Sequence, residues 1–335
     1  MSQSPTSKKL NALWQTLPAL IRCSDVAMTR ASGDSPIGRC IVTGLGGSTW
    51  PAHVLEWSMR LRNADCEVVP LSRFATDAPV GDTLVIFSQY LSNNTALALV
   101  AAQNYRRVLI VSALDERRFC ERLSDLGVTL EQFKLVTVAT PEERGFLFRP
   151  VGPALMATVG VSRLLEAAGL EALPLESIAS CYESADSVNA VDHMSNAVLS
   201  LGCDSSTAAA LAWKANEALG QPVPSWDAIG FAHGGFQATF ELPKFEALLL
   251  LPGGLPSGLA IERGLRTMLE PRGHTVRAFV SSLGGVAAPF AYDAVFMRYL
   301  LARIEASARD LESWPGKGCD AAMYNLTVLD PTSTT

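Results

Sequence analysis

The sequence predicts an α/β fold of two domains, each with a mainly parallel sheet flanked by helices. The chain has 335 residues, which is long for a single core and suits two domains of about 150 residues each. Short β-rich runs alternate with helical patterns, an order typical of parallel sheets covered on both faces. The pattern then restarts near residue 197, which indicates a duplicated unit.

The first half opens with a helical pattern over residues 10–21, which we assign to an N-terminal helical arm of residues 1–35. Beyond the arm, β-rich runs bounded by turn residues predict five strands. They span residues 39–43, 67–71, 83–87, 108–111 and 135–138. A helix is expected over residues 156–170 and a polar connector over residues 171–191. The first domain is therefore expected to span residues 36–180.

The second half repeats this order over residues 181–330, before a disordered tail at residues 331–335. A strand, a turn and a helix are expected at residues 197–201, 202–206 and 207–219, later strands at 248–251, 276–280 and 326–329, and a helix at 290–303. An offset of 156 residues superposes Val42 on Val198 and Leu55 on Leu211. Any two βα units share apolar periodicity, so the duplication depends on this offset combined with the chain length.

The composition argues against several classes of partner. Only 18% of the residues are charged and the net charge is −6, whereas a nucleic-acid surface needs clustered Lys and Arg. Seven cysteines without a C-x-x-C pair or zinc-site spacing indicate free thiols in a reducing compartment. No apolar run is long enough to span a bilayer, and no secretory signal is recognised. We expect a cytoplasmic protein with no metal, organic cofactor, nucleic-acid or membrane partner.

Two loops that follow predicted strands are rich in glycine and hydroxyl side chains. The first holds Gly46, Gly47 and Ser48, and the second holds Ser88, Gln89, Ser92, Asn93, Asn94 and Thr95. In open α/β sheets, ligands collect at the carboxyl ends of strands, where backbone N–H groups and hydroxyls suit an anion or a sugar hydroxyl. The first loop matches neither a dinucleotide fingerprint nor a P-loop. For each loop a plain turn with a helix cap is the alternative.

The order strand, Gly-Leu-Gly-Gly-Ser, helix, then strand, Ser-rich loop, Thr95, helix resembles the SIS (sugar isomerase) family. Its members include the isomerase half of glutamine–fructose-6-phosphate aminotransferase, phosphoglucose/phosphomannose isomerases and deglycases of amino-sugar phosphates. The resemblance implies two tandem SIS domains in which Ser48, Ser88, Ser92 and Thr95 contact a phosphate. In that family the second loop reads Ser-x-Ser-Gly-x-Thr. Here Asn93 replaces the glycine and three residues separate the serines, so the phosphate is held differently or the ligand lacks one.

The second half carries a Lys-x-x-Glu pattern, Lys214 to Glu217, with His233 sixteen residues beyond Glu217. This spacing is similar to that of the aminotransferase isomerase half, although Gly235 stands in place of a proline. Aldose–ketose isomerisation moves a proton between adjacent carbons, a task for a carboxylate of raised pKa. The resemblance implies that Glu217 is this base, that Lys214 contacts substrate, and that His233 opens the sugar ring from the neighbouring subunit of a homodimer. A surface glutamate and a turn histidine are the alternatives.

The family also has a lysine on its C-terminal tail that enters the site. Asn325 occupies that register here, and Lys317 is the nearest substitute. Arg149 is the candidate for stabilising the enediolate, with Arg144 as its competitor. Amination with glutamine is not expected.

The sequence therefore predicts a sugar-phosphate aldose–ketose isomerase that binds a phosphorylated sugar. Three alternatives stay open. They are a deglycase or deaminase of amino-sugar phosphates, a repurposed SIS enzyme acting on a non-phosphorylated substrate, and a non-catalytic SIS protein that binds a sugar phosphate.

Overall fold

The computed structural model describes residues 5–24, 27–28, 38–130, 133–143, 145–185, 195–201, 205–253, 256–307, 309–314 and 317–318. The chain divides into two compact units. The sheet A unit comprises residues 23–143, 151–173 and 313–335, and the sheet B unit comprises residues 1–22, 144–150 and 174–312. The predicted domain limits at residues 36, 180 and 330 stay a prediction.

Sheet A has six strands in the order β1-β6-β5-β4-β2-β3. The strands are β1 Ala27–Met28, β2 Cys40–Gly44, β3 Cys66–Val68, β4 Thr83–Phe87, β5 Arg107–Ser112 and β6 Lys134–Thr137. All neighbours pair in parallel except β1, which runs antiparallel to β6. The five strands predicted from the first half are confirmed, with ends shifted by a few residues, whereas the two-residue β1 was not predicted.

Helices cover both faces of sheet A. They are α2 Thr49–Arg60, α3 Ala96–Ala101, α4 Glu116–Asp125, α5 Val151–Leu155 and α6 Val161–Ala167, with a π-helical turn η5 at Met156–Gly160 and 3₁₀ turns η1 Gly46–Ser48, η2 Leu71–Ala75, η3 Asn93–Thr95 and η4 Ala102–Asn104. On one face, Ile110 packs in a cluster with Leu99 of α3 and Phe119 of α4. On the other, Val111 lies against Gly160, where an added Cβ would be 2.8 Å from its side chain. The alternation expected of a doubly covered strand is therefore present.

Sheet B has four parallel strands in the order β10-β9-β7-β8. They are β7 Ser195–Ser200, β8 Ser225–Asp227, β9 Phe245–Leu251 and β10 Thr275–Val280. The order matches that of β5-β4-β2-β3 in sheet A, strand for strand. The predicted strands at residues 197–201, 248–251 and 276–280 are confirmed, the edge strand β8 was missed, and residues 326–329 lie outside the described residues.

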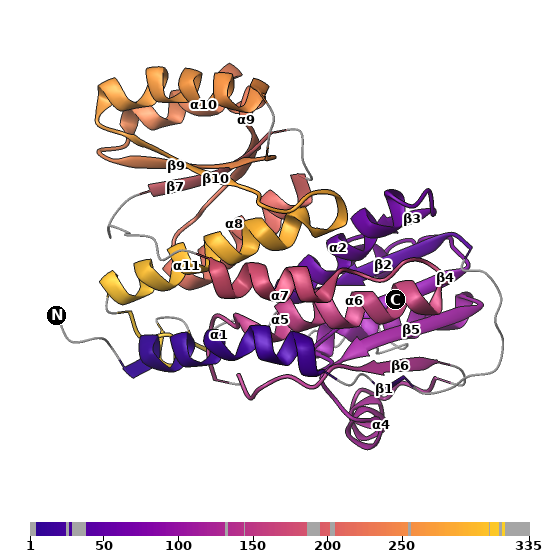
Figure 1. Cartoon of the computed structure of the whole chain (residues 1–335). Helices are drawn as coiled ribbons and strands as arrows, with labels where there is room; N and C mark the ends of the chain where they lie inside the picture. Colours follow the sequence, from indigo (N-terminus) through magenta and orange to yellow (C-terminus); the bar gives the residue numbers. More distant parts are fainter. Residues whose placement is uncertain are drawn as a thin grey trace, which may run out of the picture. The chain divides into compact units, whose positions relative to one another are not determined.

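The helices of the sheet B unit are α1 Pro5–Cys23, α7 Leu175–Ser184, α8 Ser205–Leu219, α9 Ala228–His233, α10 Pro256–Leu269 and α11 Ala288–Ser307, with 3₁₀ turns η6 Gly235–Glu241, η7 Glu270–Arg272 and η8 Gly285–Ala287. Figure 1 shows α9 and α10 over one face of sheet B and α8 and α11 over the other. Leu249 of β9 packs in a cluster with Phe231 of α9 and Leu265 of α10. The unit is thus a three-layered α/β arrangement, as the alternating pattern predicts.

The polar connector predicted at residues 171–191 is wrong in part, because α7 occupies its middle. Ile178, Cys181 and Tyr182 are buried on this helix. Their spacing of three and four residues forms a narrow apolar stripe, which the surrounding glutamates and serines obscure in the sequence. The predicted turn at residues 202–206 lies largely outside the described residues.

The 156-residue offset superposes positions with the same burial. Val42 and Val198 are both fully buried, as are Leu55 and Leu211 to within 1%. The same offset also superposes Trp57 on Trp213. These two residues do not belong to the core faces, since Trp213 is 51% exposed and Trp57 is half-buried.

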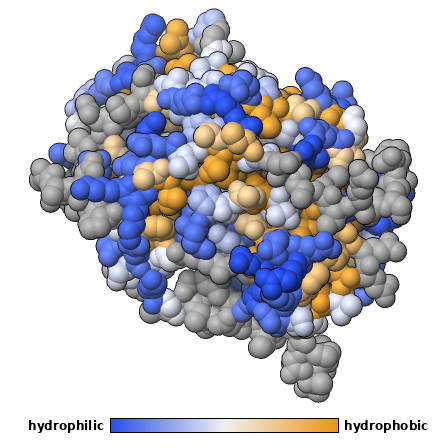
Figure 2. Space-filling view, turned by 60° about the horizontal axis from the view of Figure 1, so that its bottom comes forward, coloured by the Kyte–Doolittle hydropathy of each residue, from blue (hydrophilic) through white to orange (hydrophobic). Residues whose placement is uncertain are grey.

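Hydrophobic residues also reach the surface. On the face drawn in Figure 2 they lie among hydrophilic ones, which is usual for globular proteins. Within the described ranges, no helix is both long and apolar enough to cross a membrane.

Candidate functional site

The hydroxyl groups of Ser88, Ser92 and Thr95 lie together in the sheet A unit. Thr95 Oγ1 is 3.2 Å from Ser88 Oγ and 3.0 Å from Ser92 Oγ. Ser88 directly follows β4, and Thr95 ends the 3₁₀ turn that leads into α3. Three of the predicted phosphate contacts therefore form one hydroxyl cluster, in spite of the longer spacing between the serines.

The glycine loop leaves the sheet beside the hydroxyl cluster. Gly44 at the end of β2 pairs with Phe87 at the end of β4, so both loops start at the carboxyl ends of neighbouring strands. Gly46 has a φ of 57°, a left-handed conformation that favours glycine. A Cβ at Gly44 would lie 2.3 Å from the carbonyl oxygen of Ser48. The glycines thus make a tight turn that holds Ser48, itself buried, at this edge of the sheet.

Gln89 has a different environment from the one expected of a ligand contact. Its side chain is 5% exposed, and Nε2 donates to Tyr90 Oη and to Thr140 Oγ1, each at 3.3 Å. A Cβ on Gly152 would lie only 2.2 Å from Gln89 Nε2. The amide is thus held inside the unit, and direct contact of Gln89 with substrate stays a prediction.

Sequence reasoning missed a buried carboxylate in the same region. Glu143 is fully buried and accepts hydrogen bonds from the backbone N–H groups of Val151 at 2.9 Å and Gly152 at 2.7 Å. A carboxylate that accepts N–H bonds at the start of a helix stabilises that end. Glu143 therefore fixes the beginning of α5. The sequence from Glu143 to Leu147 has no periodic pattern, so this contact could not be predicted from it.

The loop also contains Leu91, which occupies the insertion that separates this chain from the family pattern. Leu91 is fully buried and has a φ of 45°, an uncommon conformation for a residue other than glycine. Arg122 of α4 donates from Nε to the Leu91 carbonyl oxygen at 2.9 Å and from Nη2 to Asn93 Oδ1. Asn93 and Asn94 both belong to the turn η3. A side chain of a different helix therefore fastens the loop.

The candidate base, Glu217, lies on α8 of the sheet B unit and is half-buried. Burial raises its pKa from 4.5 to about 7, although a hydrogen bond from Trp213 and the charges of Arg149 and Lys214 oppose the rise. Trp213 Nε1 donates to Glu217 Oε1 at 3.0 Å. At neutral pH both forms of the carboxyl are populated, as proton transfer in either direction requires. The sequence pattern did not identify Trp213, although it stands one helical turn before Glu217.

The raised pKa of Glu217 also links folding to pH. The folded state holds this proton more tightly than the unfolded chain does, so ionisation opposes folding. The stability contributed by the protonated form is complete below pH 4.5 and is lost as the pH rises to about 7.

Lys214, predicted as a substrate contact, is buried. Its ammonium forms an ion pair with Asp293 of α11, at 2.5 Å between Nζ and Oδ1. Tyr182 of α7 donates to the other oxygen of Asp293 at 2.9 Å. The three residues join α7, α8 and α11 inside the unit. Lys214 thus has a structural partner, and its contact with substrate stays a prediction.

His233 ends α9 and is exposed. The helix is capped at its other end by Asp227, whose Oδ1 accepts from the N–H groups of Ile229 and Gly230 at 2.9 Å each. Arg149 is half-buried and lies close enough to Glu217 to lower its pKa. The structure therefore brings Arg149 to the candidate base, whereas joint action of His233 and Glu217 stays a prediction.

Lys317 is exposed, and its ammonium lies 4.9 Å from the centre of the Trp314 ring, within the range of a cation–π contact. Its catalytic role stays a prediction. Arg144 and Asn325 lie outside the described residues.

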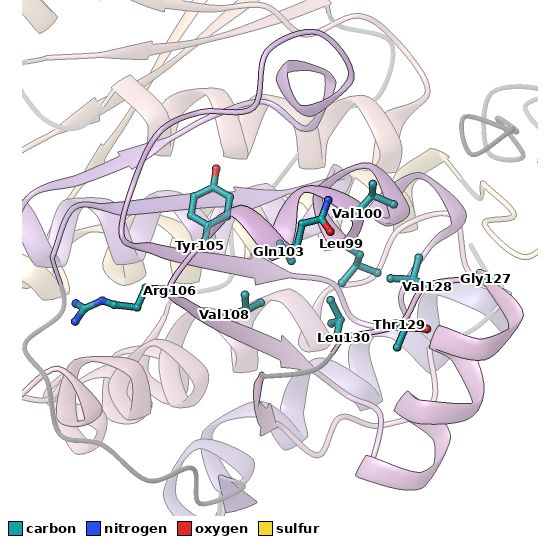
Figure 3. A pocket seen from close by; sticks show the side chains of 11 residues that line it. Leu99, Val100, Gln103, Tyr105, Arg106, Val108, Gly127, Val128, Thr129 and Leu130 are labelled. Carbon is teal, nitrogen blue, oxygen red and sulfur yellow. The ribbon is translucent and has the colours of Figure 1, made fainter. Parts of the chain in front are cut away.

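A pocket of about 480 Å³ lies elsewhere in the sheet A unit. Leu99, Val108, Val128 and Leu130 supply aliphatic walls, with Gln103 beside them, and Figure 3 shows the Arg106 side chain extending away from them. Val108 stands near the start of β5, and residues 127–130 precede β6. The pocket is therefore at the amino ends of the strands, the opposite edge from the hydroxyl cluster, and none of the predicted site residues lines it.

No family model matches the sequence, and no curated protein matches it. The fold, in contrast, is similar to solved structures over almost the whole chain. The C-terminal domain of glucosamine-fructose-6-phosphate aminotransferase from Francisella tularensis has a TM-score of 0.61 at 13% identity, covering 91% of this chain and 96% of that one.

Two further structures show the same likeness. Glucosamine-6-phosphate deaminase from Thermotoga maritima has a TM-score of 0.62 at 14% identity, covering 89% of this chain and 93% of that one. Tagatose-6-phosphate ketose/aldose isomerase from Escherichia coli has a TM-score of 0.57 at 14% identity, covering 92% and 91%. The α/β fold of this chain is therefore that of phosphosugar isomerases and deaminases.

Proposed function

We propose that the chain is a sugar-phosphate aldose–ketose isomerase of the SIS type. The observation that carries the proposal is Glu217, a half-buried carboxyl whose pKa is raised by burial to about 7. It belongs to a fold similar to that of a ketose/aldose isomerase. A surface glutamate, the alternative reading of the sequence, would keep a pKa near about 4.3.

The reaction assigned to Glu217 is a proton transfer between neighbouring carbons. The carboxylate removes the proton from the carbon beside the carbonyl group of the open-chain sugar, which leaves an enediolate. The protonated carboxyl then returns the proton to the adjacent carbon, while the hydroxyl proton moves between the two oxygens. Arg149 stabilises the negative charge of the enediolate, and His233 transfers the proton that opens the ring. We propose further that His233 acts from the second subunit of a homodimer.

The hydroxyl cluster and the glycine loop are assigned to the phosphate group. Hydroxyls donate to phosphate oxygens, and hydrogen bonds to charged groups contribute about 1.5–3 kcal/mol each. The proposal needs no bound metal or organic cofactor. Because sugar phosphates are made and used inside cells, we also assign the protein to the cytoplasm.

A second candidate function is deamination of an amino-sugar phosphate, which the likeness to a glucosamine-6-phosphate deaminase favours. The same proton transfer by Glu217 converts the amine-bearing carbon into an imine. Water then adds to this carbon, which becomes a carbonyl group as ammonia leaves. The two functions differ in their products, because only deamination yields ammonia.

Thermal unfolding against hexose, pentose and amino-sugar phosphates, beside their unphosphorylated parents, tests the proposal. A ligand at 100 times its Kd adds about 2.7 kcal/mol to the stability, enough to raise the midpoint by a few degrees. We expect a rise with at least one sugar phosphate and none with its parent. Incubation with that ligand should give the isomer, or ammonia in the case of deamination. A rise with the unphosphorylated parent alone would contradict the phosphate assignment.

A further inference from the structure

We propose that Arg122 is the positioning residue of the anion site. It lies on α4, outside the loop, and holds the loop in the shape that gathers its hydroxyls. The inference rests on the proposed function, because it concerns the site assigned to the phosphate.

The loop departs from the family pattern at the two points that Arg122 contacts. Three residues separate Ser88 from Ser92, and Leu91 is the last of them. Asn93 stands where the pattern has a glycine. Arg122 Nε donates to the Leu91 carbonyl oxygen at 2.9 Å, and Nη2 donates to the side-chain oxygen of Asn93. One guanidinium group therefore contacts both positions at which the loop differs from the family pattern, Leu91 before Ser92 and Asn93 after it.

The backbone conformation of Leu91 explains why the loop needs a stabilising contact. Leu91 has a φ of 45°, a conformation that costs a residue with a side chain about 1–2 kcal/mol. Two contacts keep it there, since its side chain is fully buried and its carbonyl oxygen accepts from Arg122. At the other end of the insertion, the Gln89 carbonyl oxygen accepts from the Ala113 N–H at 3.0 Å and from Ser112 Oγ at 3.1 Å. Hydrogen bonds thus hold both ends of the inserted residues, and Ser92 Oγ lies within hydrogen-bond distance of Thr95 Oγ1.

The guanidinium group of Arg122 also suits this positioning role. The Arg122 side chain is 29% exposed. Among the described residues it forms one ion pair, in which Nη1 lies 3.7 Å from Oδ2 of Asp125, a side chain that is 69% exposed. Such an exposed pair is weak. A guanidinium presents its donors as a fixed planar fork, which a lysine ammonium does not. Arg122 is therefore suited to fixing two acceptors at once.

The test measures the affinity for inorganic phosphate by calorimetry, with urea unfolding of each variant alongside. We expect Arg122→Ala to weaken phosphate binding about 10-fold or more. Phosphate binding by Arg122→Lys should also be weaker than in the unaltered protein, because lysine keeps the charge but lacks the planar fork of donors. The matched control is Arg117→Ala, which removes the same charge from the same helix at a side chain that is 78% exposed, and it should bind as the unaltered protein does. If Arg122→Ala does not fold, the phosphate affinity of Arg122→Lys is the measurement that decides.

The outcomes separate the inference from the proposed function. A folded Arg122→Ala protein with unchanged affinity would overturn the positioning role while leaving the anion site in place. Full recovery by Arg122→Lys would also overturn it, since charge alone would then suffice. If the unaltered protein binds no phosphate, the anion site itself is wrong and the role of Arg122 falls with it.

Discussion

The hydroxyl cluster and the Glu217 helix assemble their chemistry in different ways. The cluster consists of neutral groups from one short loop, and its members hydrogen-bond one another. Glu217 is a single charge whose property depends on burial and on Trp213, Arg149 and Lys214 around it. Substitution near the cluster should therefore change ligand affinity, whereas substitution around Glu217 should change protonation, rate and stability.

The largest effect on stability is expected at Asp293, which forms the buried ion pair with Lys214 of α8. Asp293→Asn leaves the buried Lys214 ammonium without its carboxylate, and breaking a buried ion pair costs about 3–5 kcal/mol. Urea unfolding measures the loss. Glu166→Gln is the control, because its pair with Arg163 is exposed at both ends and should contribute less than about 1 kcal/mol. Equal losses in the two variants would show that Lys214 does not depend on Asp293.

A smaller effect, confined to affinity, is expected at the cluster. Ser92→Ala removes one of the proposed phosphate donors, so the Kd for inorganic phosphate should rise about 10- to 100-fold, with little change in unfolding free energy. Calorimetric titration measures it. Ser124→Ala, at an exposed serine on α4, should leave the Kd unchanged. If Ser92→Ala also binds normally, the hydroxyl cluster is a plain turn.

The smallest effect is a shift in pH dependence. The proposed isomerase reaction needs the ionised carboxylate, so kcat/KM should rise with pH through about 7. Trp213→Phe removes a hydrogen bond that favours the ionised form, and the midpoint should move upward by about 0.5–1 unit. Activity lost at neutral pH should return at higher pH. A uniform loss at every pH would instead indicate a structural role for Trp213.

Much of the fold followed from local sequence patterns. The parallel strands of sheet A are continuous apolar runs, such as Leu84 to Phe87, and each is followed by turn residues. The pattern failed where burial is small or distributed. The edge strand β8 has only three residues, all exposed, and its single apolar residue, Trp226, forms no run. The apolar stripe of α7 is surrounded by polar residues.

The hydroxyl groups of the candidate site were predictable from the sequence, and the residues that hold the loop were not. Ser88, Ser92 and Thr95 were identified from the loop and are brought together. Arg122 and Glu143 were not, because each acts on residues distant in sequence that only the folded chain places nearby. Arg122 in particular looks like any other residue of a charged helix. Residues that position a site are therefore the part that a single sequence reveals least.

Proton transfer by Glu217 is the step on which the proposed isomerase activity depends. The direct measurement is solvent exchange in D₂O, with the sugar phosphate that stabilises the protein and proton NMR of the carbons beside its carbonyl group. We expect deuterium incorporation by the unaltered protein and a rate about 10²–10⁴-fold lower for Glu217→Gln, with an unchanged Kd for phosphate. Incorporation at the same rate in both proteins would contradict the proposed role of Glu217.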